Sequence, residues 1–164
     1  MAELTVLDEK LAEVLGLAKA AEQATRKVST LARREGETEL LELLRRMSAE
    51  ASETADRCQR VADAREGRKR AIAEKARETK REVAEFMQTY LEDAEALDGL
   101  EFLSMAEAGE LAHWEILGTL NRRAQLSAVT ELVDAVLPIQ QRHVADVRSS
   151  SLRLAADEDP AEAA

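Results

Sequence analysis

The chain has 164 residues, of which 45% are hydrophobic, 34% charged and only 2% aromatic, and its formal net charge is −10. The acidic balance disfavours binding to a nucleic-acid backbone, and four aromatic residues leave little for base stacking. A single cysteine excludes an internal disulfide. The chain has no run of eighteen apolar residues that would predict a membrane span. Helix-forming Ala, Leu, Glu, Arg and Lys dominate the composition. Together these features predict a cytoplasmic, all-α domain.

Apolar residues recur at spacings of three and four, which is typical of amphipathic helices. The pattern predicts four long helices over about 5–35, 38–66, 98–123 and 127–154. Thr5 and Asp8 are expected to cap the first helix, and Gly36 is expected to end it. Gly67 is expected to end the second helix, and Asp98 to open the third.

The segment between the second and third long helices is strongly charged, and it is predicted to form a further helix over about 69–96. Its first part, Arg68 to Glu82, holds seven Lys or Arg residues and three Glu residues. Glu74, Glu78 and Glu82 are spaced by four beside rows of basic residues, which favours a solvated helix with ion pairs over a nucleic-acid patch. We therefore expect a crossover helix that packs only partly on the remaining helices.

The connections between the helices indicate the architecture. The first two helices and the last two are joined by short links, whereas the connection between the second and third is long. The sequence therefore predicts a ferritin-like four-helix bundle with a long helical crossover between helices 2 and 3. Residues 1–155 are assigned to this single domain, and 156–164 to a flexible acidic tail.

Polar residues interrupt the apolar faces of all four long helices near mid-length. They are Glu22 on the first helix, Glu50 and Glu53 on the second, Glu107, Glu110 and His113 on the third, and Gln140 and His143 on the fourth. Burying unpaired carboxylates or imidazoles is costly, and a divalent cation is the simplest partner for several at one level. Metal sites in such bundles take Glu from two helices and Glu-x-x-His from the other two. The sequence therefore predicts a metal site for iron, with manganese or zinc as alternatives.

A metal-free bundle is the alternative interpretation. Glu22 and Glu53 lie at the edges of the apolar stripes, where they can reach water. Gln140 stands where the pattern wants a glutamate, which removes a negative charge and weakens metal affinity. In this alternative the polar side chains bond to one another, and the chain acts as a dimerisation or protein-interaction module without a cofactor. Cys58 lies within an apolar stripe and is expected to be an inert, buried thiol rather than a nucleophile.

Three stretches of the chain resemble a known family. They are KAAEQATRKV (Lys19 to Val28), SAEASETADRCQRV (Ser48 to Val61) and EAGELAHWEILGTL (Glu107 to Leu120). In this order they resemble the bacterial ferritin-like family of YciE and YciF, over most of the chain. The resemblance implies a dimeric, stress-associated protein with a di-metal centre, and it allows a ferroxidase-like oxidoreductase activity without deciding whether the chain is an enzyme.

The resemblance also implies a rearranged set of metal ligands. Glu22 matches the family's glutamate on the first helix, and Glu53 matches the glutamate of its Glu-Thr pair, with Glu50 where histidine is often found. Glu110 matches the first glutamate of the third helix, and His113 takes the place of the second. Gln140 and Gln141 replace the acidic pair of the last helix, with His143 downstream. We expect these side chains to meet in the centre of the bundle.

Overall fold

The computed structural model describes residues 3–162 of the chain. Within this range the chain forms five α-helices and no strand, which confirms the predicted all-α class. The helices are α1 (Val6–Glu35), α2 (Thr38–Asp63), α3 (Lys69–Tyr90), α4 (Ala96–Ala124) and α5 (Ser127–Asp157). None of the described helices is both long and apolar enough to cross a membrane.

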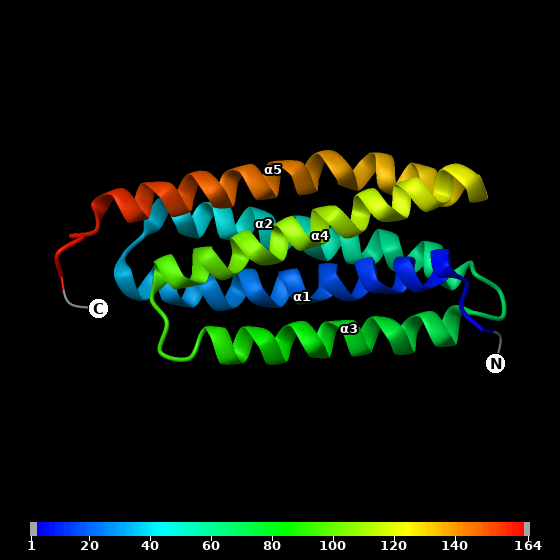
Figure 1. Cartoon of the computed structure of the whole chain (residues 1–164), viewed down its shortest axis with the longest axis horizontal. Helices are drawn as coiled ribbons and strands as arrows, with labels where there is room; N and C mark the ends of the chain where they lie inside the picture. Colours follow the sequence, from blue (N-terminus) through cyan, green and yellow to red (C-terminus); the bar gives the residue numbers. More distant parts are fainter. Residues whose placement is uncertain (1–2, 163–164) are drawn as a thin grey trace.

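The five helices lie side by side along one long axis (Figure 1). α1 packs against α2 and α4, and α5 packs against α4 and α2, so these four helices form a bundle with α1 and α5 at opposite corners. α3 packs on the outer side of α1 and carries the chain back to the end of the bundle where α4 begins. α3 is thus a helix attached to one side of a four-helix core.

The ends of α1 follow the predicted signals. The Thr5 side chain accepts a hydrogen bond from the backbone N–H of Asp8, and the Asp8 carboxylate accepts one from the backbone N–H of Thr5. This reciprocal pair satisfies two amides that the first turn of a helix leaves free. At the other end Gly36 has φ +74°, a left-handed conformation that glycine adopts without steric cost.

The other helix ends differ from the sequence-based prediction. α2 ends at Asp63 rather than residue 66, and α3 ends at Tyr90 rather than residue 96. α4 begins at Ala96, because Glu95 and not Asp98 is the N-cap; Asp98 is the third helical residue and closes the capping box with Glu95. α5 continues to Asp157, so its last turn includes the first two residues of the predicted tail.

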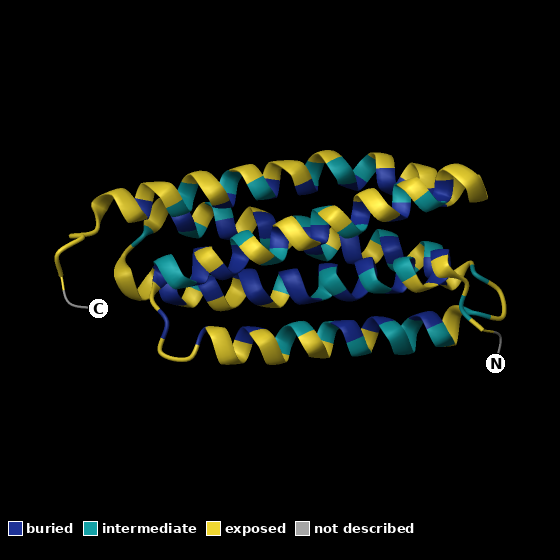
Figure 2. Cartoon of the chain, in the orientation of Figure 1, coloured by how far each residue is buried: buried dark blue, intermediate teal, exposed yellow. Residues whose placement is uncertain are grey.

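The buried apolar side chains form two clusters at the two ends of the bundle, and buried positions run along the inner faces of the helices (Figure 2). Leu15, Cys58 and Trp114 belong to one cluster, and Leu44 and Leu103 belong to the other. Along α2, α4 and α5 the two clusters are separated by polar residues, whereas α1 contributes alanines to the stretch between them. The fold therefore places a polar layer between two hydrophobic ones.

Candidate functional site

The polar layer consists of side chains from α2, α4 and α5. Its members are Glu50 of α2, Glu107 and Glu110 of α4, and Gln140 and His143 of α5. All of them except the half-buried Glu50 are at most 3% exposed. Four of these five predicted residues are thus buried inside the bundle and Glu50 lies at its edge, whereas α1, which was expected to contribute Glu22, supplies none of them.

His143 stands at the centre of the layer and uses both ring nitrogens. Its Nε2 lies 2.6 Å from Glu50 Oε2, and its Nδ1 lies 3.3 Å from Glu107 Oε2. The Gln140 amide donates to the same Glu107 oxygen at 2.6 Å and also to the Glu107 backbone carbonyl at 3.3 Å. α5 is thereby bonded to α2 on one side and to α4 on the other.

The two carboxylates that contact His143, those of Glu50 and Glu107, favour its protonated form, the imidazolium. Burial alone would lower the pKa of His143, but its hydrogen bonds to Glu107 and Glu50 and the charges of both carboxylates outweigh burial and raise it. Burial would likewise raise the pKa of Glu50, but hydrogen bonds from His143 and Arg142 lower it below its ordinary value. The protonated ring therefore stabilises the carboxylates that hold it.

Glu110 lies one turn from Glu107 on α4 and has a different environment. Burial raises the pKa of Glu110 well above its ordinary value, the charge of Glu107 raises it further, and a hydrogen bond from Trp114 opposes them. Trp114 Nε1 donates to Glu110 Oε1 at 3.3 Å.

Burial also raises the pKa of the Cys58 thiol, and the charge of Glu110 adds to the effect. This agrees with the expectation of an inert, buried cysteine.

Glu22 and Glu53, two of the predicted ligands, lie outside the polar layer. Glu22 pairs with Arg26 at 2.6 Å, and Glu53, which is exposed, pairs with Arg57 at 2.7 Å. Each pair joins residues four apart on one helix surface. Both glutamates reach water, as the edge positions of their stripes allow, so the ligand roles that the sequence suggested for them find no support in their placement.

His113 does not join Glu110 in the core, although the Glu-x-x-His spacing suggested it. Its side chain is 35% exposed and faces α1, where Nδ1 lies 3.2 Å from both Lys10 Nζ and Glu13 Oε2. Residues three apart on a helix differ by about 60° in direction, and here that rotation separates the two side chains. Trp114, at a spacing of four, shares the direction of Glu110 instead.

The sequence interpretation also missed side chains that complete the layer. Arg142 reaches from α5 to the Glu50 carboxylate and pairs with the oxygen that His143 leaves free. The Trp114 indole supplies the hydrogen bond to Glu110. The spacing of four between Glu110 and Trp114 was a usable signal, whereas the contact of Arg142 with Glu50 depends on how α2 and α5 pack.

The geometry of the polar layer bears on the predicted metal site. Within residues 3–162 no group of three or more His, Cys, Asp or Glu side chains is arranged to hold a metal ion. Glu107 Oε2 and His143 Nδ1, however, are separated by 3.3 Å, and two neighbouring ligands that each lie about 2.1 Å from one ion are about 3.0–3.4 Å apart. The 2.6 Å contact between Glu50 and His143 Nε2 is too short to span an ion and is a hydrogen bond.

Comparison with known proteins gives no assignment for this chain. No protein-family model, curated protein or solved structure matches it. The functional argument therefore depends on the side chains of the polar layer.

Proposed function

We propose that this chain is a ferritin-like metal-binding protein in which a single divalent ion binds between Glu107 and His143. The observation that carries the proposal is the 3.3 Å separation of Glu107 Oε2 and His143 Nδ1, two donor atoms on side chains that are at most 3% exposed. Glu110, one turn along α4, is the nearest further carboxyl on the same helix, and its charge interaction with Glu107 supports a role as third ligand.

The remaining residues of the layer would orient this pair. The Glu50 carboxylate contacts His143 Nε2, and a carboxylate in this position commonly orients the ring of a metal-ligating histidine. Arg142 in turn forms an ion pair with Glu50. Gln140 holds Glu107. This mixture of oxygen and nitrogen donors suits iron, manganese or zinc. Iron or manganese, when bound, would supply redox chemistry towards dioxygen or peroxide, which is the stress-related role that the family resemblance implies.

A proton competes with the metal for His143 in this arrangement. Because both ring nitrogens face carboxylates, the metal-free protein favours the imidazolium, and an ion must displace the proton on Nδ1. We therefore expect metal affinity to rise with pH through the range in which His143 titrates.

The test is titration of the chelator-treated protein with Mn²⁺ and Zn²⁺, followed by elemental analysis and thermal unfolding. We expect about one ion per chain and a higher melting temperature with metal. His143→Ala and Glu107→Gln should abolish both effects. His113→Ala and Glu53→Gln are matched controls, because they remove the other histidine and an exposed glutamate. Equal metal uptake by His143→Ala and wild type would contradict the proposed ligands.

A metal-free interaction module is the second candidate, and a specific observation favours it. Among the described residues, every polar side-chain atom that is inaccessible to solvent has a hydrogen-bond partner, so none of the inaccessible atoms of the layer needs an ion. In that case the layer fixes the register of α2, α4 and α5, and the chain functions as a homodimer. An unchanged melting temperature with and without metal supports this candidate over the metal centre.

A further inference from the structure

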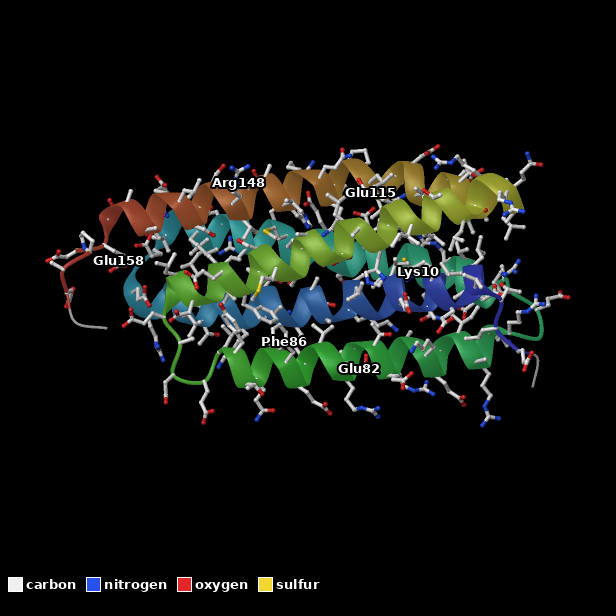
Figure 3. The ribbon with its side chains drawn as sticks, viewed as in Figure 1. Lys10, Glu82, Phe86, Glu115, Arg148 and Glu158 are labelled. Carbon is white, nitrogen blue, oxygen red and sulfur yellow. The ribbon has the colours of Figure 1, made fainter. Side chains whose placement is uncertain are left out.

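A groove with apolar walls lies beside the polar layer, between α1, α3 and α4. It has a volume of about 180 Å³. Its lining includes the buried Ala20 and Ala24 of α1, the exposed Gly109 of α4, and the aromatic residues Phe86 and Phe102. Figure 3 shows Phe86 on the side of α3 that faces the rest of the bundle. The groove exists because α3 packs on α1 while α4 lies on another side of α1.

One buried polar group opens into this groove. Glu110 lines it and is only 3% exposed, and its Oε1 accepts the hydrogen bond of Trp114. Its other oxygen, Oε2, makes no hydrogen bond within the described residues. Within residues 3–162 every polar side-chain atom that is inaccessible to solvent has a hydrogen-bond partner. Because Glu110 Oε2 has no partner, it is accessible, and it borders the open space of the groove. This accessible oxygen of a largely buried carboxyl is therefore left to bond with an occupant.

We propose that this groove binds a small, uncharged aromatic molecule that carries one hydroxyl group, with its ring packed against the contacting pair Phe86 and Phe102, whose ring centroids lie 5.6 Å apart, and its hydroxyl on Glu110 Oε2. A cavity of about 150 Å³ with apolar walls holds a benzene ring, so the volume of this groove suits a single ring with a small substituent. Aromatic walls favour an aromatic ring by edge and offset contacts. A hydroxyl both donates and accepts, so it can bond to a carboxyl oxygen in either protonation state.

The charge of the occupant follows from the surroundings. An anionic group would lie beside the carboxyls of Glu110 and Glu107, in a chain of net charge −10. A cationic group would lose its hydration against walls whose polar side chains are Glu110 and the half-buried His113 and whose other side chains are apolar. An uncharged hydroxyl avoids both costs. The proposal shares Glu110 with the metal centre, in which Glu110 would be the third ligand, but it needs no metal ion and is therefore tested in chelator.

Trp114 provides a direct measurement of binding. It is the only tryptophan of the chain, it is fully buried, and its indole bonds to the same carboxyl that the ligand would contact. The experiment titrates the full chain, in chelator, with phenol and p-cresol and follows Trp114 fluorescence together with calorimetry. We expect saturable binding of one molecule per chain, weaker binding of toluene, and none of benzoate or benzylamine.

Two variants test the location of the ligand. A side chain added at Gly109 meets no atom within 4 Å, so Gly109→Met should fold and fill the groove, and binding should be lost. Ala108→Met is the matched control, because Ala108 is exposed on the same helix and is not part of the groove. Glu110→Leu should weaken phenol by about tenfold, the effect of one hydrogen bond, and leave toluene unchanged.

Several results would overturn the proposal. They are the absence of saturable phenol binding, unchanged binding by Gly109→Met, and preferred binding of benzylamine over phenol. A second copy of the chain seated in the groove would also overturn it; sedimentation would then show a dimer that Gly109→Met dissociates. Loss of metal binding alone leaves phenol binding intact, so the failure of the metal centre and the failure of this site are distinguishable.

Discussion

His143 Nε2 lies 2.6 Å from Glu50 Oε2, and this contact joins α5 to α2 in the centre of the bundle. The same ring faces Glu107 of α4 through Nδ1 at 3.3 Å. One imidazole thus connects three of the four bundle helices. Its protonation state therefore links the electrostatics of the polar layer to the packing of the bundle.

The first prediction concerns the pKa of His143. Removal of one carboxylate in Glu50→Gln should lower this pKa, because the hydrogen bond and charge of Glu50 help to raise it. The measurement is an NMR titration of the two histidines in chelator. Glu53→Gln is the control and should leave His143 unchanged, since Glu53 pairs with Arg57 on the surface. An unchanged His143 pKa in Glu50→Gln would contradict the contact.

The same change has a pH-dependent effect on stability. A raised native pKa means that the folded state holds the proton more tightly than the unfolded state, for which 6.5 is the ordinary value. The resulting stabilisation is complete below that value and is lost as pH rises through the native pKa. The stability advantage of wild type over Glu50→Gln should therefore be larger at pH 5.5 than at pH 9, measured by urea unfolding.

The second prediction concerns Glu110. Burial raises the pKa of this carboxyl, with the charge of Glu107 adding to the effect, so the folded state keeps its proton to higher pH than the unfolded state. Stability should then fall as pH rises from the ordinary pKa of 4.5 through the native value. Glu110→Gln removes the titrating carboxyl and therefore removes this pH-dependent loss of stability. Relative to wild type it should gain stability between pH 4 and pH 8 in chelator; a constant difference over that range would rule out the titration.

The third prediction concerns Asp8, a fully buried carboxylate that caps α1 and binds two arginines. Arg65 Nε lies 2.7 Å and Arg68 Nε 3.4 Å from its oxygens, which ties the α2–α3 connection to the start of α1. Both arginines are partly exposed, so we expect Asp8→Asn to cost about 2–3 kcal/mol at pH 7, below the full value for a buried pair. Glu9→Gln, an exposed neighbour, is the control for urea unfolding.

The pH dependence of this substitution has the opposite sign to that of Glu110. Burial alone would raise the pKa of Asp8, but hydrogen bonds from Arg65 and Thr5 and the charge of Arg65 lower it below its ordinary value of 3.8. The stabilisation is therefore present above pH 3.8 and is lost as pH falls through the native pKa. The gap between wild type and Asp8→Asn should narrow as the pH falls below 3.8, and a gap that stays constant there would contradict the ion pair.

The fourth prediction compares one substitution at two glycines. A Cβ at Gly16 would lie 2.5 Å from the Ala76 carbonyl oxygen and 2.7 Å from Thr79 Cβ, so Gly16→Ala should force α3 away from α1 and cost about 1–3 kcal/mol. At Gly109 a Cβ meets nothing, and Gly109→Ala should stabilise by about 0.5–1 kcal/mol through helix propensity. Thermal unfolding checks the signs, and hydrogen exchange should localise the Gly16→Ala effect to α3.

Local signals in the sequence were sufficient for the helices and for the burial of most of the polar layer. The spacing of apolar residues predicted four long helices, and the spacing of charged residues predicted the fifth. Thr5, Asp8 and Gly36 predicted both ends of α1 because caps depend on residues a few positions apart. The same spacing placed Glu107, Gln140 and His143 on buried faces. The boundary between α3 and α4 was misjudged, because either Glu95 or Asp98 can cap a helix and local sequence does not choose between them.

The sequence by itself thus determined that the chain is helical and which faces of its helices are buried, because helix periodicity and capping act within one or two turns. Only the tertiary structure decided which polar residues meet. Glu22, Glu53 and His113 share the spacing of their buried neighbours, yet small rotations about each helix axis turn them to water or to α1, whereas Glu50, Glu107 and His143 join. Contacts across helices depend on the rotation of each helix about its axis and on its shift along it, and both are set by the packing of the two apolar clusters.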